Sequence, residues 1–141
     1  MSRIMAVDYG DVRTGVALSD PLGKIPGSTW VLTQTGKKLA AAIAALAREH
    51  GAETVVVGCP RNMDGSFGPR AQKSIEFAKS LENRGLRVAM RDERLTTVDA
   101  HGILRRQGIG GKARKGIVDA VAASLILQDY LDFRNNSDSP I

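Results

Sequence analysis

The sequence predicts an α/β fold in which a mixed five-stranded sheet carries helices on both faces. Two observations support this prediction. The chain begins with three short strand-like segments separated by turns rich in Gly, Pro and Asp, and the rest alternates between helical and strand-like patterns. Strands joined by short turns pair antiparallel, whereas strands joined through helices pair parallel. The sheet should therefore contain both kinds of pairing, and the first three strands of the chain should be the antiparallel ones.

Each element is predicted from a local pattern. Short β-branched and aliphatic runs indicate strands, and the hairpin-sized link DYGDVRTG joins the first two. Segments rich in Ala and Leu with helical spacing indicate helices, the first of which closes at Gly51. The predicted strands are Arg3–Asp8, Gly15–Ser19, about Ser28–Thr33, 53–58 and Leu86–Met90, and the predicted helices are 36–51, 71–85, from Thr96 or Thr97 to about Gln107, and from about Lys115 to Leu131.

Length and composition indicate one ordinary globular domain over residues 1–133, followed by a polar tail, 134–141, that we expect to be disordered. The single cysteine, Cys59, has no partner for an internal disulfide and is expected to be a small buried hydrophobe. We find no signal peptide and no apolar run long enough to cross a bilayer. A cytoplasmic protein without a membrane partner is therefore expected.

Basic residues indicate a polyanionic partner. The net charge is +5. Five positive charges and no negative one lie in the eleven-residue, Gly-rich segment 105–115. An ordinary solvated loop would explain that segment equally well. A second loop, Gly10–Gly15, has glycines that would let a phosphate backbone approach closely. The candidate nucleic-acid-binding residues are Gly10, Arg13, Lys112, Arg114 and Lys115.

Three carboxylates stand where a hydrophobic core would not place them. Asp8 ends the first strand, Glu93 follows the last predicted strand, and Asp119 lies in a helix that is apolar almost all round. Simpler interpretations remain open: Asp8 could cap a turn, Glu93 could pair with a neighbouring arginine, and Asp119 could gain from the helix macrodipole. Asp92 and Glu93 should point to opposite faces of an extended chain, so only one of them is expected to join Asp8.

One metal site would explain all three acids. Hard oxygen ligands suit Mg²⁺ or Mn²⁺, and two such ions held roughly 4 Å apart can stabilise the attacking and leaving oxygens of an in-line displacement. Because the metal activates the attacking water, no histidine base is required. His50 and His101 are accordingly expected to be structural or exposed.

Four segments together resemble the YqgF/RuvX family. They are VDYGDVRTGVALSD, VVVGCPRNMDGSFGPRA, DERLTT and KARKGIVDAVAASLILQDYL, and the similarity runs in order over Arg3–Leu131. Cys59 stands where an aliphatic residue is expected, a departure that concerns packing only. The resemblance implies an RNase H-like fold related to the resolvase RuvC, with Asp8, Glu93 and Asp119 as catalytic acids and metal ligands. It also implies a nuclease, since family members are described as processing the 5′ end of pre-16S ribosomal RNA or as Holliday junction resolvases.

The expected mode of binding is recognition of backbone and shape, with affinity falling as salt rises. The basic segment Lys112–Lys115 precedes Asp119 in the chain, so we expect it to hold phosphates beside the metals. Trp30, Phe77 and Tyr130 are assigned to core packing, and base stacking is not expected to dominate.

Three alternatives to RNA processing stay open. Cleavage of a four-way DNA junction calls for two active sites and hence a dimer, whereas a monomer would count against it. A binding protein without catalysis would tolerate Asp8→Asn. An ATPase of the actin and sugar-kinase type needs two such domains, and this chain has room for one.

Overall fold

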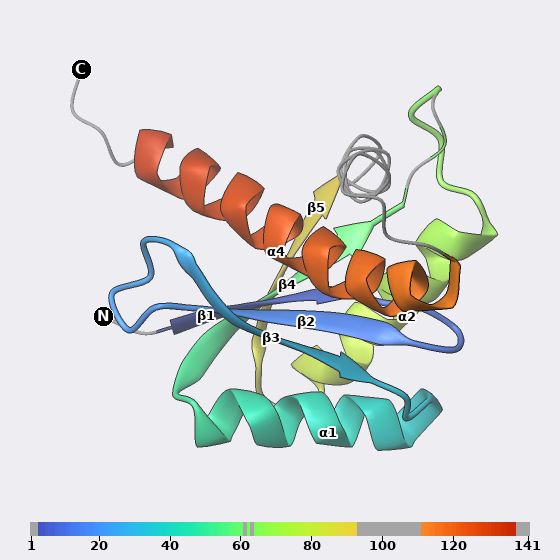
Figure 1. Ribbon diagram of the computed structural model, residues 1–141, viewed down its shortest axis with the longest axis horizontal. Coiled ribbons are helices and arrows are strands. Elements are labelled where there is room, and N and C mark those ends of the chain that lie inside the picture. Colours follow the sequence, from blue (N-terminus) through green and yellow to red (C-terminus); the bar gives the residue numbers. More distant parts are fainter. Residues whose placement is uncertain (1–2, 61, 63, 93–110, 138–141) are drawn as a thin grey trace.

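Five strands form one mixed sheet in the order β3-β2-β1-β4-β5. The computed structural model describes residues 3–60, 62, 64–92 and 111–137 (Figure 1). β1 (Arg3–Asp8) is central and pairs antiparallel with β2 (Thr14–Ser19), which pairs antiparallel with β3 (Pro26–Leu32). On its other side, β1 pairs parallel with β4 (Ala52–Cys59), and β4 pairs parallel with β5 (Arg87–Asp92). The predicted mixed sheet with its antiparallel start is confirmed.

Helices cover both faces of this sheet, as the sequence predicts. α1 (Gly36–Glu49) and α2 (Pro69–Glu82) lie on one face, and α4 (Gly111–Ser137) crosses the other (Figure 1). α1 forms because Ala and Leu favour the helix, and it ends before Gly51, whose positive φ of 70° is typical of a helix C-terminus. The crossovers β3-α1-β4 and β4-α2-β5 make the parallel half of the sheet.

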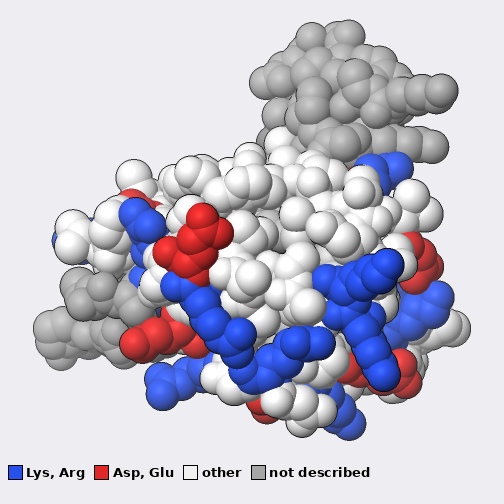
Figure 2. Space-filling model, turned by 90° about the horizontal axis from the view of Figure 1, so that it is seen from below, with Lys and Arg blue, Asp and Glu red and all other residues white. Residues whose placement is uncertain are grey.

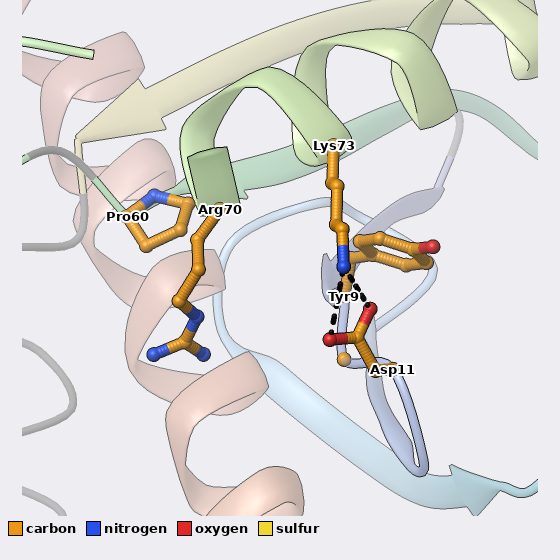
Figure 3. A pocket seen from close by; sticks show the side chains of 6 residues that line it. Tyr9, Asp11, Pro60, Arg70 and Lys73 are labelled. Carbon is orange, nitrogen blue, oxygen red and sulfur yellow. Dashed lines mark hydrogen bonds and ion pairs between the residues drawn. The ribbon is translucent and has the colours of Figure 1, made fainter. Parts of the chain in front are cut away.

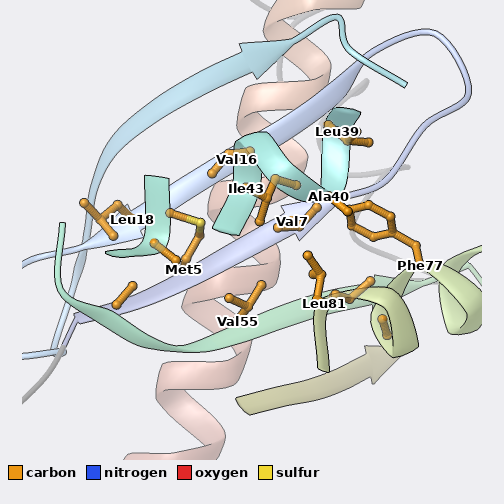
Figure 4. Close-up of a cluster of buried hydrophobic side chains, with 14 residues drawn as sticks. Met5, Val7, Val16, Leu18, Leu39, Ala40, Ile43, Val55, Phe77 and Leu81 are labelled. Atoms are coloured by element: carbon orange, nitrogen blue, oxygen red, sulfur yellow. The ribbon is translucent and has the colours of Figure 1, made fainter. Parts of the chain in front are cut away.

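Large aliphatic side chains fill the core between the sheet and the helices α1 and α2. Met5 and Val7 of β1 meet Leu39 and Ile43 of α1, and Leu81 of α2 completes the layer (Figure 4). Each of these side chains is fully buried. Burying one such side chain contributes about 1.5–3 kcal/mol, so this layer supplies much of the folding free energy.

The core beneath α4 uses smaller residues on the strand side. Ala6 of β1 and Ala17 of β2 face Ile126 and Leu127 of α4. Because successive residues of a strand point to opposite faces, the same strand supplies both layers: Ile4 and Ala6 toward α4, Met5 and Val7 toward α1. Small side chains on the strands allow α4 to lie close to the sheet.

The ends of α4 differ from the prediction. The helix begins at Gly111, four residues before the expected Lys115, and continues through Ser137, six residues past Leu131. Glycines at 110, 111 and 116 favour a turn by local propensity, and packing of α4 on the sheet overrides that preference. The first four residues of the predicted tail are therefore helical, and Arg134 among them donates a hydrogen bond to the carbonyl of Gly23 at 2.7 Å.

Two smaller predictions remain. Cys59 is buried, as expected. The helix predicted over 96–107, together with His101, lies outside the described residues. None of the helices in the described ranges is long and apolar enough to cross a membrane.

Candidate active site

Asp8 lies at the C-terminal end of the central strand, at an edge of the sheet. β1 and β4 run parallel, so both end at this edge. The side chain of Asp8 follows the alternation of Ile4 and Ala6 and is thereby directed to the face that α4 covers. Asp8 is half-buried. A carboxylate in this position can reach groups on α4 while remaining accessible from the sheet edge.

Asp119 is brought to the same place by Gly15. The register of β1 and β2 sets Gly15 directly opposite Asp8, and residues paired in this way are about 5 Å apart between their Cα atoms. A Cβ atom added to Gly15 would overlap the backbone carbonyl oxygen of Asp119. The backbone of α4 therefore rests on Gly15 itself, next to Asp8. The backbone of Asp119 thus lies close to that of Asp8 although the two residues are far apart in sequence.

Arg13 holds the Asp119 carboxylate. Its Nε donates to Oδ2 of Asp119 at 2.8 Å, so the loop between β1 and β2 is tied to α4 by a charge-assisted hydrogen bond. The Asp119 side chain is 18% exposed and that of Arg13 is 35% exposed. Arg13 was predicted to contact nucleic acid; in the structure it first serves as the partner of a candidate metal ligand.

The helix macrodipole does not account for Asp119. Because α4 begins at Gly111, Asp119 lies in the third turn of the helix, not in the second as the sequence suggested. The dipole effect fades beyond the first turn. A mostly buried carboxylate in an apolar helix is costly unless it is paired, and Arg13 provides that pairing.

The third predicted acid, Glu93, lies outside the described residues, directly after the end of β5. Among residues the structure does describe, no three His, Cys, Asp or Glu side chains form a metal-binding group. Asp92, the last residue of β5, is exposed and shares the alternation of Val88 and Met90, which pack toward α1 and α2. Asp92 is therefore directed away from Asp119.

The predicted nucleic-acid contacts have different outcomes. Gly10 is required by its own loop, because a Cβ there would overlap the carbonyl oxygen of Arg13. Lys112, Arg114 and Lys115 lie in the first two turns of α4, not in a turn before it, and their side chains are outside the described part of the structure.

His50 is half-buried, and the centroid of its ring lies 5.3 Å from that of Trp30. This packing agrees with the structural role expected for His50.

Gly15 is the residue whose role the sequence did not reveal. The sequence predicts Gly15 as the start of a strand and as the last glycine of a loop that would admit a phosphate; the structure confirms the strand, β2, and shows that Gly15 admits the backbone of α4. An isolated Gly inside a strand pattern is the general signal for close backbone approach, and that signal is present here. The identity of the approaching segment could not be inferred from it.

The chain is similar to known proteins over nearly its whole length. A model of the RuvX family, described as Holliday junction resolvase, matches residues 2–133. A protein of Halothermothrix orenii named "Putative pre-16S rRNA nuclease" is 44% identical over 135 residues, covering 94% of this chain and 96% of its own. A protein of Moorella thermoacetica with the same name is 46% identical over 132 residues, covering 92% of this chain and 94% of its own.

Solved structures show the same fold at low sequence identity. RuvC of T. thermophilus in complex with a Holliday junction substrate superposes with a TM-score of 0.57 at 13% identity, covering all of both chains. The large terminase nuclease of phage G20c with bound zinc gives 0.56 at 15% identity, covering 92% of this chain and 80% of its own. The predicted RNase H-like fold is confirmed.

Proposed function

This chain belongs to the RuvX family, and from that premise we propose that it is a cytoplasmic, metal-dependent nuclease that hydrolyses phosphodiester bonds in 5′-end processing of pre-16S rRNA. The observation that carries the proposal is the seating of α4 on Gly15. It places Asp119 over the residue that pairs with Asp8. The apolar helix α4 brings Asp119 toward Asp8 at the edge of the sheet. Burial of carboxylates costs free energy, so hydrophobic packing alone does not favour this arrangement.

The residues at this edge fit a divalent metal. Asp8 and Asp119 offer hard oxygen ligands, and Mg²⁺ or Mn²⁺ is the class of ion that such ligands prefer. Glu93, which lies outside the described residues directly after β5, is the expected third ligand on the strength of the family resemblance; the described residues Ala89 and Arg91 of β5 are directed toward α4. When bound, one or two such ions would activate water and stabilise the charge that develops on the leaving oxygen.

The chain's own contribution is position and charge. Arg13 orients the Asp119 carboxylate, and the same hydrogen bond ties the loop 9–13, which follows β1, to α4. We propose that Lys112, Arg114 and Lys115, which precede Asp119 by two turns or less on α4, contact the phosphates that flank the cut bond. Gly15 sets the height of α4 above the sheet and with it the separation of the two acids.

Two substrates are supported to different degrees. Pre-16S rRNA is favoured because the similar proteins of H. orenii and M. thermoacetica bear that name over nearly their full length. A Holliday junction is the second candidate, supported by the family's description. A junction has two strands to cut symmetrically, so it requires a homodimer, whereas a monomer is sufficient for an RNA end.

The test compares wild type with Asp8→Asn on a labelled pre-16S 5′-end fragment and on a four-way DNA junction. Mg²⁺, Mn²⁺ and EDTA are run in parallel. Asp129→Asn is a matched control, because Asp129 is also an acid of α4 but pairs with Arg91, ten residues from Asp119. We expect metal-dependent cutting of the RNA, abolished by Asp8→Asn and retained by Asp129→Asn.

Other outcomes decide between the alternatives. Cutting of the junction by a protein that sediments as a dimer would replace RNA processing with junction resolution. Cleavage that survives in Asp8→Asn or in EDTA would remove the proposed metal site. Salt-sensitive binding to RNA without cleavage, equal in all three proteins, would indicate a binding protein.

A further inference from the structure

A second candidate site lies on the face of the sheet opposite the acids. An open groove of about 820 Å³ runs between α1 and α2. Its α2 wall is a single helical stripe of residues spaced three, four and seven apart, and its α1 wall is formed by the first turns of that helix. The lining includes Lys37 and Ala40 of α1 and Lys73, Phe77 and Ser80 of α2, with Arg84 just past the end of α2.

Among the described residues, three cations and two acids line the groove, which leaves an excess of one positive charge. Lys37, Lys73 and Arg84 line it, and Arg48 lies at the Arg84 end, where its Nη2 donates to the Arg84 carbonyl at 2.8 Å. Two acids also line the groove, Asp11 and Glu76, of which Asp11 is already paired with Lys73 at 3.2 Å. Figure 2 views the molecule from the side that carries α1 and shows Lys and Arg side chains spread across this surface.

Tyr9 connects the groove to the candidate active site. It follows Asp8 directly and points to the other face of the sheet, where its ring stacks on Phe77 with centroids 4.6 Å apart and planes 10° apart. Phe77 is 6% exposed and forms the buried partner, whereas Tyr9 remains half-buried and lines the groove. The stacked pair therefore presents an aromatic surface in the wall of the groove.

A small pocket extends the groove toward the sheet edge. It is lined by Tyr9, Asp11 and Lys73, which also line the groove, and further by Gly10, Pro60 and Arg70. Lys73 projects from α2 toward Asp11, with which it pairs, whereas Arg70 projects from the start of α2 away from that pair (Figure 3). This pocket lies between the loops that follow β1 and β4, beside the edge where Asp8 is located. A nucleic-acid strand that leaves the active site could thus pass Arg70 and Lys73 of the small pocket and enter the groove.

We propose that the groove between α1 and α2 binds a single-stranded segment of the RNA substrate beyond the cleavage site. Tyr9 provides a stacking surface for a base, and Lys37, Lys73 and Arg84 contact phosphates. Aromatic rings beside a line of cations are the usual means of binding single strands without base-specific contacts. From Lys73 to Arg84 the wall is about 16 Å long by the helical rise per residue, which accommodates several phosphates.

A nucleic acid suits this groove better than an acidic peptide. The cations are distributed along the groove and accompany an aromatic surface, which matches the repeating phosphates and bases of a single strand. From the sequence we expected no dominant role for stacking, because Trp30, Phe77 and Tyr130 were assigned to the core. Tyr9 changes that expectation, since Phe77 is indeed buried but supports a second ring that is not. This inference rests on the proposed function, because its ligand is the substrate of that nuclease.

The test measures binding of a fluorescent pre-16S fragment by anisotropy in EDTA, where metal-dependent cleavage is absent. The double variant Lys37→Ala/Arg84→Ala removes two groove cations. Its control, Lys38→Ala/Lys79→Ala, removes two exposed cations of the same two helices that do not line the groove. Both lower the net charge from +5 to +3, so non-specific attraction changes equally.

We expect the groove variant to bind about tenfold more weakly than the control and to reduce the slope of log K against log salt by about 1.4, at ~0.7 per single-strand phosphate. Tyr9→Leu should weaken binding by about fivefold or more, while Tyr9→Phe, which keeps the ring, should bind as wild type does. An RNA lacking its single-stranded segment should show neither difference.

The two proposals fail in distinguishable ways. If groove and control variants bind alike while cleavage still depends on Asp8, the groove inference is overturned and the nuclease stands; the groove would then be free to serve a protein partner. If Tyr9→Leu binds as well as Tyr9→Phe, the stacking role is overturned. If wild type neither binds nor cleaves the RNA, both proposals fall.

Discussion

The two faces of the sheet differ in the size of the side chains that the same strands contribute to each. Toward α1 and α2, β1 and β2 present Met5, Val7, Val16 and Leu18, all buried. Toward α4, in the stretch nearest the acids, they present Ala6, Ala17 and Gly15. Large residues hold a helix away from the sheet by a full layer of hydrocarbon, whereas small ones let its backbone make direct contact.

This difference assigns most of the hydrophobic core to one face of the sheet and the candidate active site to the other. The α1 and α2 face contains a thick apolar core in which charged groups stay at the rim. The α4 face accepts an acid, Asp119, in the third turn of the helix and an ion pair, Arg13–Asp119, at the point where the helix backbone contacts Gly15. The comparison suggests that α4 is positioned by backbone contact and charge, and α1 by hydrophobic volume.

The largest effect expected is that of Asp119→Asn on cleavage. Loss of an outer-sphere partner of a metal site costs about 10–100-fold, so loss of a direct ligand should exceed ~100-fold. The amide can still accept a hydrogen bond from Arg13, so the fold should be retained. Rates of cleavage under single-turnover conditions, with circular dichroism as a check on folding, measure the effect. Cleavage within a few fold of wild type would mean that the α4 face does not carry the chemistry.

Gly15→Ala should have the next largest effect. The added Cβ would meet the backbone of α4, which cannot rotate away as a side chain can, so the helix must shift. We expect a loss of about 3 kcal/mol in the free energy of unfolding, at the upper end of overpacking costs, together with loss of cleavage. The control is Gly68→Ala, whose Cβ would meet only the side-chain amide of Asn62 at 3.2 Å. Equal stability of the two variants in urea would show that α4 does not depend on this contact.

Ile43→Val and Ile126→Val compare the two cores directly. Both residues are buried, one on α1 and one on α4, and each variant should lose about 1 kcal/mol of unfolding free energy. Activity per folded molecule should be unchanged in Ile43→Val and reduced in Ile126→Val, because only the second supports the helix that carries Asp119. Identical activities of Ile43→Val and Ile126→Val would contradict the inference that only the α4 face supports the active site.

The smallest effect expected is the coupling between Arg13 and Asp119 in stability. The pair is partly exposed, and such pairs contribute less than about 1 kcal/mol. A double-mutant cycle with Arg13→Ala and Asp119→Ala measures it, and the cycle for Arg91 and Asp129 serves as the surface comparison. A coupling of several kcal/mol would mean that this ion pair, and not Gly15, positions α4.

Local patterns predicted much of the architecture. Strand alternation and the helical spacing of apolar residues identified the strands and helices of the described chain, β1 to the residue, and the acids Asp8 and Asp119 stood out because each conflicts with its apolar surroundings. The start of α4 was missed because glycine has low helical propensity, and contact with the sheet compensates for it. Periodicity reports which way a side chain points, but not how closely two elements approach.

The sequence by itself determined the alternating strands, the helical faces and the residues whose charge is out of place, because these depend on neighbours within one or two turns. Only the tertiary structure decided which distant groups meet. Arg13 and Asp119 are 106 residues apart, and their contact depends on the register of β1 and β2 together with the seating of α4 on Gly15. The stacking of Tyr9 on Phe77 likewise depends on how α2 packs against the sheet. Such contacts arise from the packing of whole elements, which no local pattern encodes.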